Sequence, residues 1–465
     1  MPFARERATG RACGMLGGPP RPNPPMFEPV SNARASESAL IRAMGFWALA
    51  ASIVNVTIGG SIFALPGTLA ASMGAAAPLA FVIGAFLFVP ITLCFAAAAS
   101  RATVTGGPYS YVAAAFGPFP GFATAAFLWI SSVAGNASLA AISANQAAHV
   151  FPSLALPVPR SIFLLAMYAL LAALNARGIK LSAAAILIFA AAKVLPLMLL
   201  VCAGSWFVHW DNLKVAAAPT WNSIGSSLVI VVFAYSGIET ALAPSGEVRN
   251  PARIVPKAAL VGVATVIALY VGLQWIAQGV LGAALIGNNA PLAAVADRIA
   301  PGGGRLLVLV AAVSLFGCMQ GDLLGSSRLL YALARDGFLP ARIASLTKTK
   351  RVPLLAIIGH SLAAWAAASA GSFTTLALVS GGAFCFVYIA SCAAAWQLQR
   401  RNAAQAQKPL SLPGGPTLPL LGIAGLCGIL LTLEREEWFA IGCALVGITI
   451  LFAYNRWYRH GTLIR

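Results

Sequence analysis

Charged residues are scarce in this sequence. They make up 9% of its 465 residues, whereas hydrophobic residues make up 59%. Ordinary soluble domains contain about 25% charged residues, so a soluble fold of this length could not cover its surface. Apolar blocks of about 20 residues instead indicate a polytopic α-helical membrane protein. They exclude a transmembrane β-barrel, whose strands are short and alternate in polarity.

Motifs for metal binding and for catalysis are also missing. The eight cysteines include no CxxC pair and the four histidines form no HExxH motif, so neither a disulfide framework nor a metal site is indicated. The sequence shows no catalytic triad, nucleotide-binding loop or sizeable soluble domain. We therefore expect a protein that is not an enzyme and that has no metal and no cofactor.

Twelve apolar segments follow a polar, proline-rich stretch. Residues 1–42 predict a disordered cytoplasmic tail and not a cleavable signal peptide. Residues 43–400 predict a ten-helix core, and residues 401–465 two additional transmembrane helices with a short cytoplasmic C-terminus. The predicted spans are 43–69, 75–100, 119–148, 160–176, 181–208, 222–244, 256–282, 304–333, 353–370, 373–398, 416–433 and 437–457.

The basic residues give an orientation. With the N-terminus inside, 24 of the 30 Lys and Arg residues fall on the cytoplasmic side, five fall outside and Lys193 lies within a span. This asymmetry predicts that both termini are cytoplasmic and that the protein spans the cytoplasmic (inner) membrane. The net charge of +18 is thus mostly a sign of topology and of contact with the lipid bilayer, and no nucleic-acid partner is expected.

Two spans carry small and polar residues near mid-membrane. The first contains two adjacent glycines and a serine, Gly59-Gly60-Ser61, and the sixth contains Tyr235-Ser236-Gly237. Close helix packing by small residues is the simpler interpretation of either segment alone. Because the two segments lie five spans apart, matching weak points favour an inverted-repeat transporter with discontinuous helices 1 and 6.

An interruption of this kind has a chemical consequence. Unwound backbone frees N–H and C=O groups where bulk water is absent, so these groups must line a cavity or bind a ligand. The half-helix that follows Gly60 offers N–H groups and a positive dipole end to a carboxylate. The freed carbonyls suit an ammonium group, and together the two sets fit the main chain of an amino acid.

Four motifs in order resemble the amino acid–polyamine–organocation (APC) superfamily of permeases. They are GGSIFALPG at 59–67, TGGPYSY at 105–111, FAYSGIET at 233–240 with GEVRNPARIVPKA at 246–258, and SSRLLYALARDGFLP at 326–340. The resemblance implies a five-plus-five inverted-repeat fold, like that of a sodium-coupled leucine transporter, with two extra helices. It also implies transport of amino acids or amines by alternating access.

The resemblance further implies a set of binding residues. Gly60, Ser61 and Ile62 would hold the substrate carboxylate, and carbonyls near Thr57, Ile58, Phe233, Ala234 and Ser236 would hold the amine. Gly59, Tyr235 and Gly237 complete the predicted site within the two breaks. The usual order in the family, Gly-Ser-Gly, is Gly-Gly-Ser here, which favours a carboxylate held mainly by backbone N–H groups.

Lys193 is a candidate proton carrier. It lies about 18–22 Å from either end of its span, too far for its amine to reach water. In the family, a lysine at the matching place occupies the site where relatives bind sodium, and such members are proton-coupled or ion-independent. The alternative is a permanently paired structural lysine.

Two acids complete the predicted site. Glu239 follows the break in the sixth span and is a second candidate for proton coupling, or else a carboxylate that bonds to backbone freed by the break. Asp322 lies in the eighth span, where an acid is unusual for the family. It is a candidate for recognition of a cationic substrate side chain, for an ion pair with Lys193, or for a place in the cytoplasmic vestibule.

These features predict a secondary transporter that imports amino acids or related amines by proton symport. A sodium-independent exchanger of the same fold is the first alternative, and a membrane substrate sensor is an alternative of another class. The expected partners are a small-molecule amino acid or amine, protons and lipid, in a monomer or homodimer.

Overall fold

The computed structural model describes residues 42–63, 65–102, 105–215, 218–288, 290–371, 373–401, 409–431, 438, 441–442 and 445–454. This part of the chain is helical, and its only extended pairing is an isolated bridge between Met44 and Val248. The predicted tail up to residue 41 lies outside the described residues, as do residues 437, 439–440, 443–444 and 455–457 of the last predicted span. Eight of the described helical segments are long and apolar enough to cross a membrane, so the protein is a multi-pass membrane protein.

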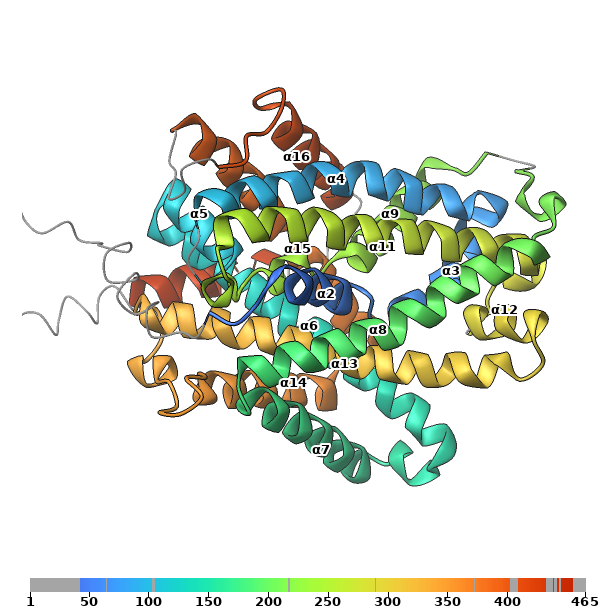
Figure 1. Ribbon diagram of the computed structural model, residues 1–465, viewed down its shortest axis with the longest axis horizontal. Helices are drawn as coiled ribbons and strands as arrows, with labels where there is room; N and C mark the ends of the chain where they lie inside the picture. The colour runs from blue at the N-terminus through green and yellow to red at the C-terminus, as the bar shows by residue number, and fades with distance from the viewer. Residues whose placement is uncertain are drawn as a thin grey trace, which may run out of the picture.

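The long helices coincide with predicted spans (Figure 1). Each forms on a long apolar run, and most begin or end beside a glycine, proline or charged residue. Their bounds are α4 (Ala77–Arg101), α6 (Pro118–Val150), α7 (Pro157–Ala176), α8 (Ile179–Gly204), α11 (Pro251–Leu281), α13 (Gly303–Arg335), α14 (Leu354–Ala370), α15 (Phe373–Arg400) and α16 (Thr417–Leu430). Two nine-residue helices, α5 (Pro108–Phe116) and α12 (Pro291–Ile299), lie between the long helices. Each is too short to appear in the sequence as a membrane-spanning apolar run.

The first and sixth predicted spans are each interrupted, at the places where the sequence predicts breaks. Helix α2 (Phe46–Thr57) is followed by the 3-10 turn Ser61–Phe63 and then by α3 (Leu65–Met73). Helix α9 (Trp221–Tyr235) is separated from the short α10 (Ile238–Ala241) by Ser236 and Gly237.

The two breaks lie against each other. Gly237 has φ +135°, a backbone conformation that residues with a Cβ rarely adopt. A Cβ built on it would lie 2.7 Å from Thr57 Oγ1 and 2.9 Å from the Thr57 backbone nitrogen. Glycine at this position therefore permits both the turn and the close approach of the second break to the first.

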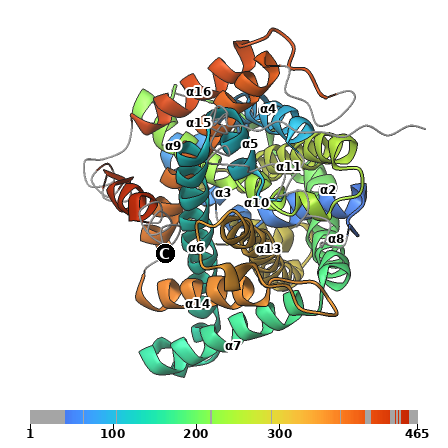
Figure 2. The same ribbon diagram turned by 90° about the vertical axis from the view of Figure 1, so that its left-hand side faces the viewer.

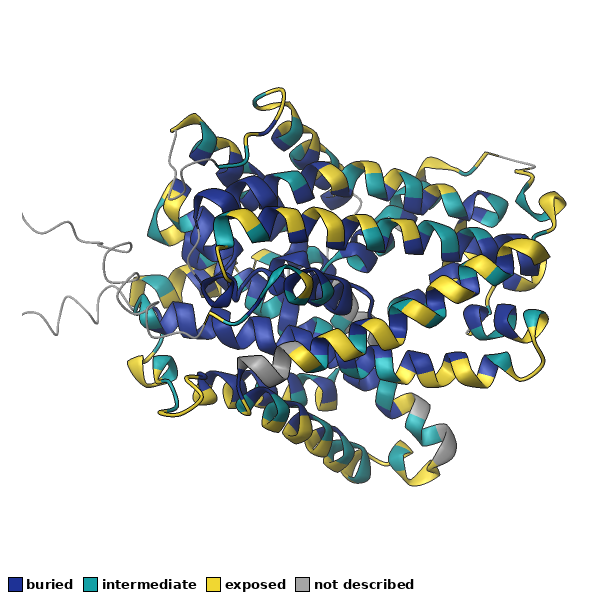
Figure 3. Ribbon diagram, viewed as in Figure 1, coloured by how far each residue is buried: buried dark blue, intermediate teal, exposed yellow. Residues whose placement is uncertain are grey.

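The broken helices lie inside the bundle and the outer helices present apolar surface. Helix α2 contacts α8, α11 and α13, and a view along the bundle places α3 and α10 near its middle (Figure 2). Exposed residues gather on the outward faces of α7 and α8 (Figure 3), where they include Leu170, Ile188 and Leu199. Apolar residues on the outside are what a helix in contact with lipid tails requires.

A buried ion pair holds one end of the bundle together. Arg328 of α13 donates from Nε to Glu247 Oε1 at 2.7 Å, and both side chains are at most 3% exposed. The loop that carries Glu247 also exchanges backbone hydrogen bonds with Met44: Met44 N–H donates to the Glu247 carbonyl at 3.0 Å, and Arg249 N–H to the Met44 carbonyl at 2.9 Å. The residues before α2 are thus linked through this loop to α13.

Substitution of Arg328 by methionine should destabilise the protein strongly, because it leaves the Glu247 carboxylate buried without its partner. Breaking one side of such a pair typically costs about 3–5 kcal/mol. The measurement is the melting temperature of the detergent-purified protein.

Two controls separate this loss from a general effect of mutation. The double variant Arg328→Met with Glu247→Leu should recover most of the stability, since no unpaired charge remains. Asp211→Asn, at the exposed Lys214–Asp211 pair (2.7 Å), should change stability by about 1 kcal/mol or less. A single Arg328→Met variant as stable as the wild type would contradict the assignment.

Candidate substrate site

A cavity of about 60 Å³ lies where the two breaks meet. Its walls come from the end of α2, the middle of α6, the α9–α10 turn, α13 and α15, and most of them are small or hydroxyl-bearing side chains. The lining residues are Val56, Thr57, Gly59, Ser61, Ser131, Ser132, Gly135, Asn136, Leu139, Phe233, Ser236, Gly237, Glu239, Thr240, Cys318, Asp322, Ser380 and Phe384.

The structure brings most, but not all, of the predicted residues to this cavity. Those that line it are Thr57, Gly59, Ser61, Phe233, Ser236, Gly237, Glu239 and Asp322. Those that lie outside the lining are Ile58, Gly60, Ile62, Ala234, Tyr235 and Lys193.

Two of the predicted residues outside the lining pack against neighbouring helices. A Cβ built on Gly60 would lie 2.2 Å from Leu315 Cδ2, so Gly60 allows α13 to approach. The Tyr235 hydroxyl donates to the Phe81 carbonyl at 3.1 Å, and its ring stacks on Tyr270. Tyr235 therefore holds α9 to its neighbours and does not wall the cavity.

Lys193 binds the broken end of α2. Its side chain is fully buried, and Nζ donates to the carbonyls of Asn55 (3.0 Å), Ile58 (2.7 Å) and Ser314 (3.0 Å). A protonated amine has three donors and no acceptor, so three carbonyls use all of them. No ion pair with Asp322 is found among the described residues, and the structure thus does not support the predicted alternative that these two residues pair.

Other donors satisfy the remaining carbonyls at the break. Ser314 Oγ donates to the carbonyls of Ile58 and Gly59, both at 3.0 Å. Tyr270 donates to the Thr57 carbonyl at 2.9 Å, and Cys318 Sγ to the Val56 carbonyl at 2.8 Å. The Ile58 carbonyl already has two donors, so it is not free to hold a substrate amine as the sequence predicts.

The N–H groups after the break are in a different situation. Within the described part of the chain, those of Gly60, Ser61 and Ile62 have no backbone acceptor, whereas Phe63 N–H donates to the Gly60 carbonyl at 3.3 Å. The hydroxyl of Thr57, which lines the cavity, is also without a partner there. Of the three, Ser61 lines the cavity, so the site offers one residue with a free backbone donor and another with a free hydroxyl.

Glu239 is fully buried and both of its carboxylate oxygens are bonded. Oε1 accepts from the Gly237 N–H at 2.7 Å and Oε2 from the Tyr388 hydroxyl at 2.7 Å. An acid in the first turn of α10 is favourably placed for the free N–H groups of that turn. Glu239 thus joins the second break to α15.

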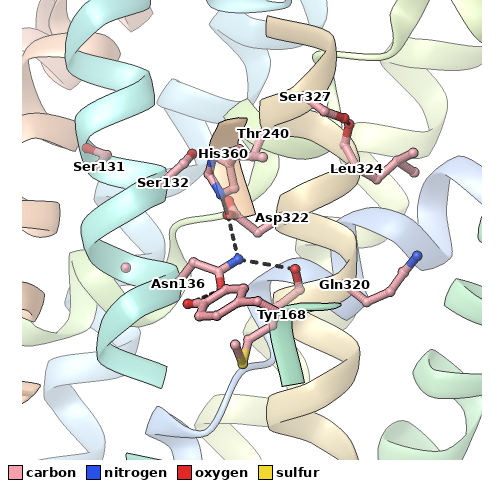
Figure 4. A network of polar contacts seen from close by, with 12 residues as sticks. Ser131, Ser132, Asn136, Tyr168, Thr240, Gln320, Asp322, Leu324, Ser327 and His360 are labelled. Atoms are coloured by element: carbon pink, nitrogen blue, oxygen red, sulfur yellow. Dashed lines mark hydrogen bonds and ion pairs between the residues drawn. The ribbon is translucent and has the colours of Figure 1, made fainter. Parts of the chain in front are cut away.

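Asp322 belongs to a network that crosses four helices (Figure 4). Its Oδ2 accepts from Asn136 Nδ2 on α6 at 2.9 Å, and Asn136 Oδ1 accepts from the Tyr168 hydroxyl on α7 at 3.1 Å. His360 Nε2 on α14 lies 3.6 Å from the same Asp322 oxygen. In Figure 4 Gln320 points to the opposite side of α13, away from this network.

Sequence reasoning missed several of these partners. Asn136, Tyr168, Ser314, His360 and Tyr388 occupy no recognised motif. The available signal was their polarity, since a buried polar side chain inside an apolar span must bond to something. That signal does not reveal which helix supplies the partner.

Two neighbouring glycines should respond differently to an added methyl group. In Gly59→Ala the new Cβ would lie 3.3 Å from Cys318 Sγ at the cavity wall, so we expect KM for uptake to rise about tenfold, equivalent to about 1.4 kcal/mol of binding. In Gly60→Ala it would collide with Leu315, and overpacking of this kind costs about 1–3 kcal/mol of stability. Uptake kinetics and melting temperature, measured on both variants, check the pair; an unchanged KM in Gly59→Ala would argue against the cavity as the substrate site.

Comparison with known proteins agrees with this architecture. Residues 44–454 match the family model described as amino acid permease. A serine/threonine exchanger of Bacillus subtilis is 24% identical over 90% of this chain and 98% of its own length. A branched-chain amino acid permease of the same organism is 24% identical over 91% of this chain and 95% of its own.

A further relative matches over a shorter length. The cationic amino acid transporter 9 of Arabidopsis thaliana, a chloroplastic protein, is 27% identical over 68% of this chain, and the match spans 59% of the plant protein. All three relatives are named as permeases, transporters or exchangers of amino acids. The chain belongs to the amino acid permease family of the amino acid–polyamine–organocation superfamily, whose members are transporters and not enzymes.

Proposed function

We propose that this protein is a proton-coupled secondary transporter that imports an amino acid or related amine across the cytoplasmic membrane by alternating access. Membership of the family supports amino acid transport. We further propose that the protein has twelve spans, with a five-plus-five inverted-repeat core over residues 43–400 and cytoplasmic termini. Transport would be coupled to protons and would need no cofactor.

The substrate main chain would bind between the two breaks. Its carboxylate would accept from the free N–H groups of Gly60 and Ser61, at the positive end of the turn that follows. Its ammonium would donate to Thr57 Oγ1 and to carbonyls at the end of α9. This arrangement leaves out the Ile62 N–H. It also leaves out the carbonyls of Ile58 and Phe233, each of which already accepts two hydrogen bonds. At Thr57 the hydroxyl takes the place of the carbonyl, which accepts from Tyr270.

The observation that carries proton coupling is the set of three carbonyls around Lys193 Nζ. The ammonium joins α8 to the broken end of α2 and to α13. A neutral amine has two N–H donors and a lone pair, which would face a carbonyl oxygen and repel it. Loss of the proton therefore weakens the link between these helices and favours the state in which α2 has moved, so one charge biases a two-state element.

Proteoliposomes with an imposed pH gradient test this role. Lys193→Ala should lose uphill accumulation, while substrate binding is retained because the main-chain site lies elsewhere. Lys214→Ala is the matched control, since its side chain is 77% exposed, and it should accumulate substrate like the wild type. If Lys193→Ala still accumulates substrate under a pH gradient alone, or if sodium accelerates wild-type uptake, the proton-carrier role is wrong.

A sodium-independent exchanger is the second candidate. The similarity to a serine/threonine exchanger and, at 28% identity over 63% of this chain, to an arginine/ornithine antiporter of Pseudomonas aeruginosa favours it. In that case Lys193 would stay protonated as a permanent link. Uptake that strictly needs substrate inside the vesicle would identify exchange, and a protein that binds an amino acid without moving it would indicate a sensor.

Glu239→Gln tests the second coupling residue. The glutamine carbonyl can accept from Gly237 N–H and its amide can donate to the Tyr388 oxygen, so the link between α10 and α15 survives while the charge is lost. We expect binding to be retained and the pH dependence of uptake to flatten. Tyr388→Phe, which removes the hydrogen bond and keeps the acid, should retain the pH dependence; an unchanged pH profile in Glu239→Gln would return Glu239 to a structural role.

A further inference from the structure

Asp322 differs from the other acid of the cavity. Both oxygens of Glu239 are bonded, and its side chain is fully buried. At Asp322, by contrast, Asn136 and His360 both approach Oδ2. Among the described residues Oδ1 has no hydrogen-bond partner, and the side chain, 10% exposed, lines the cavity.

The charges around the cavity are unbalanced. Among the described residues that line it, two are acids and none is a lysine or arginine. The main chain of an amino acid carries one positive and one negative charge, so it adds no net charge. A carboxylate in such a place needs a cation.

His360 is the one basic group beside Asp322 in the described part of the chain. It is fully buried, neither ring nitrogen has a hydrogen-bond partner there, and Nε2 lies 3.6 Å from Asp322 Oδ2. The other titratable groups that face Asp322 are Tyr168 on α7, Cys318 on α13 and Glu239 on α10, and none of these carries a positive charge. A protonated His360 can therefore balance Asp322 when the cavity holds no other cation.

We propose that Asp322 binds a second amine on the substrate side chain, so that this transporter prefers a short diamino acid, and that protonated His360 competes with this amine for Asp322. This inference rests on the proposed function, because it uses the same cavity. Because the cavity is small, at about 60 Å³, we favour a short diamino acid such as 2,4-diaminobutyrate or ornithine over arginine. Charge-assisted hydrogen bonds of this kind are strong and specific.

The test compares amino acids that differ only in the terminal group. Norvaline has a methyl group where 2,4-diaminobutyrate has its second amine, and norleucine stands in the same relation to ornithine. Equilibrium binding to the detergent-purified protein is measured, without a gradient, so the result does not depend on coupling. At neutral pH the wild type should bind 2,4-diaminobutyrate at least about tenfold more tightly than norvaline.

Variants then locate this preference. Asp322→Asn keeps an oxygen for Asn136 and should reduce the preference to about twofold or less by weakening 2,4-diaminobutyrate and not norvaline. Asp211→Asn, at an exposed acid that is not among the cavity-lining residues, should keep the preference. Melting temperatures show whether each variant is folded, and ornithine with norleucine gives a second, independent pair in every variant.

The pH dependence has a definite sign. Competition by a protonated His360 predicts that wild-type affinity for 2,4-diaminobutyrate falls relative to norvaline as the pH is lowered. His360→Gln should remove this dependence. A wild type that binds the two ligands equally, or an Asp322→Asn variant that keeps the full preference, would overturn the inference.

Failure of this inference is distinguishable from failure of the proposed function. If norvaline and other neutral amino acids bind and are transported without any charge preference, only the role of Asp322 is wrong. If the folded wild type neither binds nor moves any amino acid or amine, the proposed function itself fails.

Discussion

The structure depends on how the broken end of α2 is satisfied in the absence of water. Ending a helix inside a membrane leaves carbonyl groups without partners, and each would cost several kcal/mol if it stayed unbonded. Lys193 supplies two of the donors, to the carbonyls of Asn55 and Ile58, and its positive charge lies at the negative end of the α2 dipole. Ser314, Tyr270 and Cys318 supply the others. The carbonyls are thus bonded by the protein, whereas the N–H groups of Gly60, Ser61 and Ile62 have no backbone acceptor among the described residues.

Buried charges in the described part of the chain follow one rule, with one exception. Arg328 pairs with Glu247, Lys193 bonds three carbonyls, and Glu239 accepts from two donors. Each of these groups ties together segments that are distant in sequence, so charge is used here to fix positions between helices. Asp322 is the exception because only one of its oxygens, Oδ2, has a partner among the described residues, while its side chain lines the cavity.

Much of this arrangement could be predicted from the residues themselves. Long apolar runs locate the helices, and paired small residues locate both breaks, because these are local properties of the chain. The depth of Lys193 also follows from its place in a span. The direction of a side chain around a helix is different, since packing decides it. Tyr235 directly precedes the break, yet its hydroxyl bonds to the Phe81 carbonyl, and Gly60 packs against Leu315. The link from Asp322 to His360 joins two helices whose contact no local pattern encodes.

Helix α2 is attached at both of its ends. Its twelve residues form a rod of about 18 Å, held at the break by Lys193 and, just before Phe46, by the backbone pairing of Met44 with residues 247–249. A rigid rod fixed at two points cannot tilt until one of them is released. If the attachment at the break is released first, the pairing at Met44 becomes the pivot, and the inner end of α2 sweeps through the widest arc. In that case a few backbone hydrogen bonds in a loop outside the substrate site would set the position of the hinge.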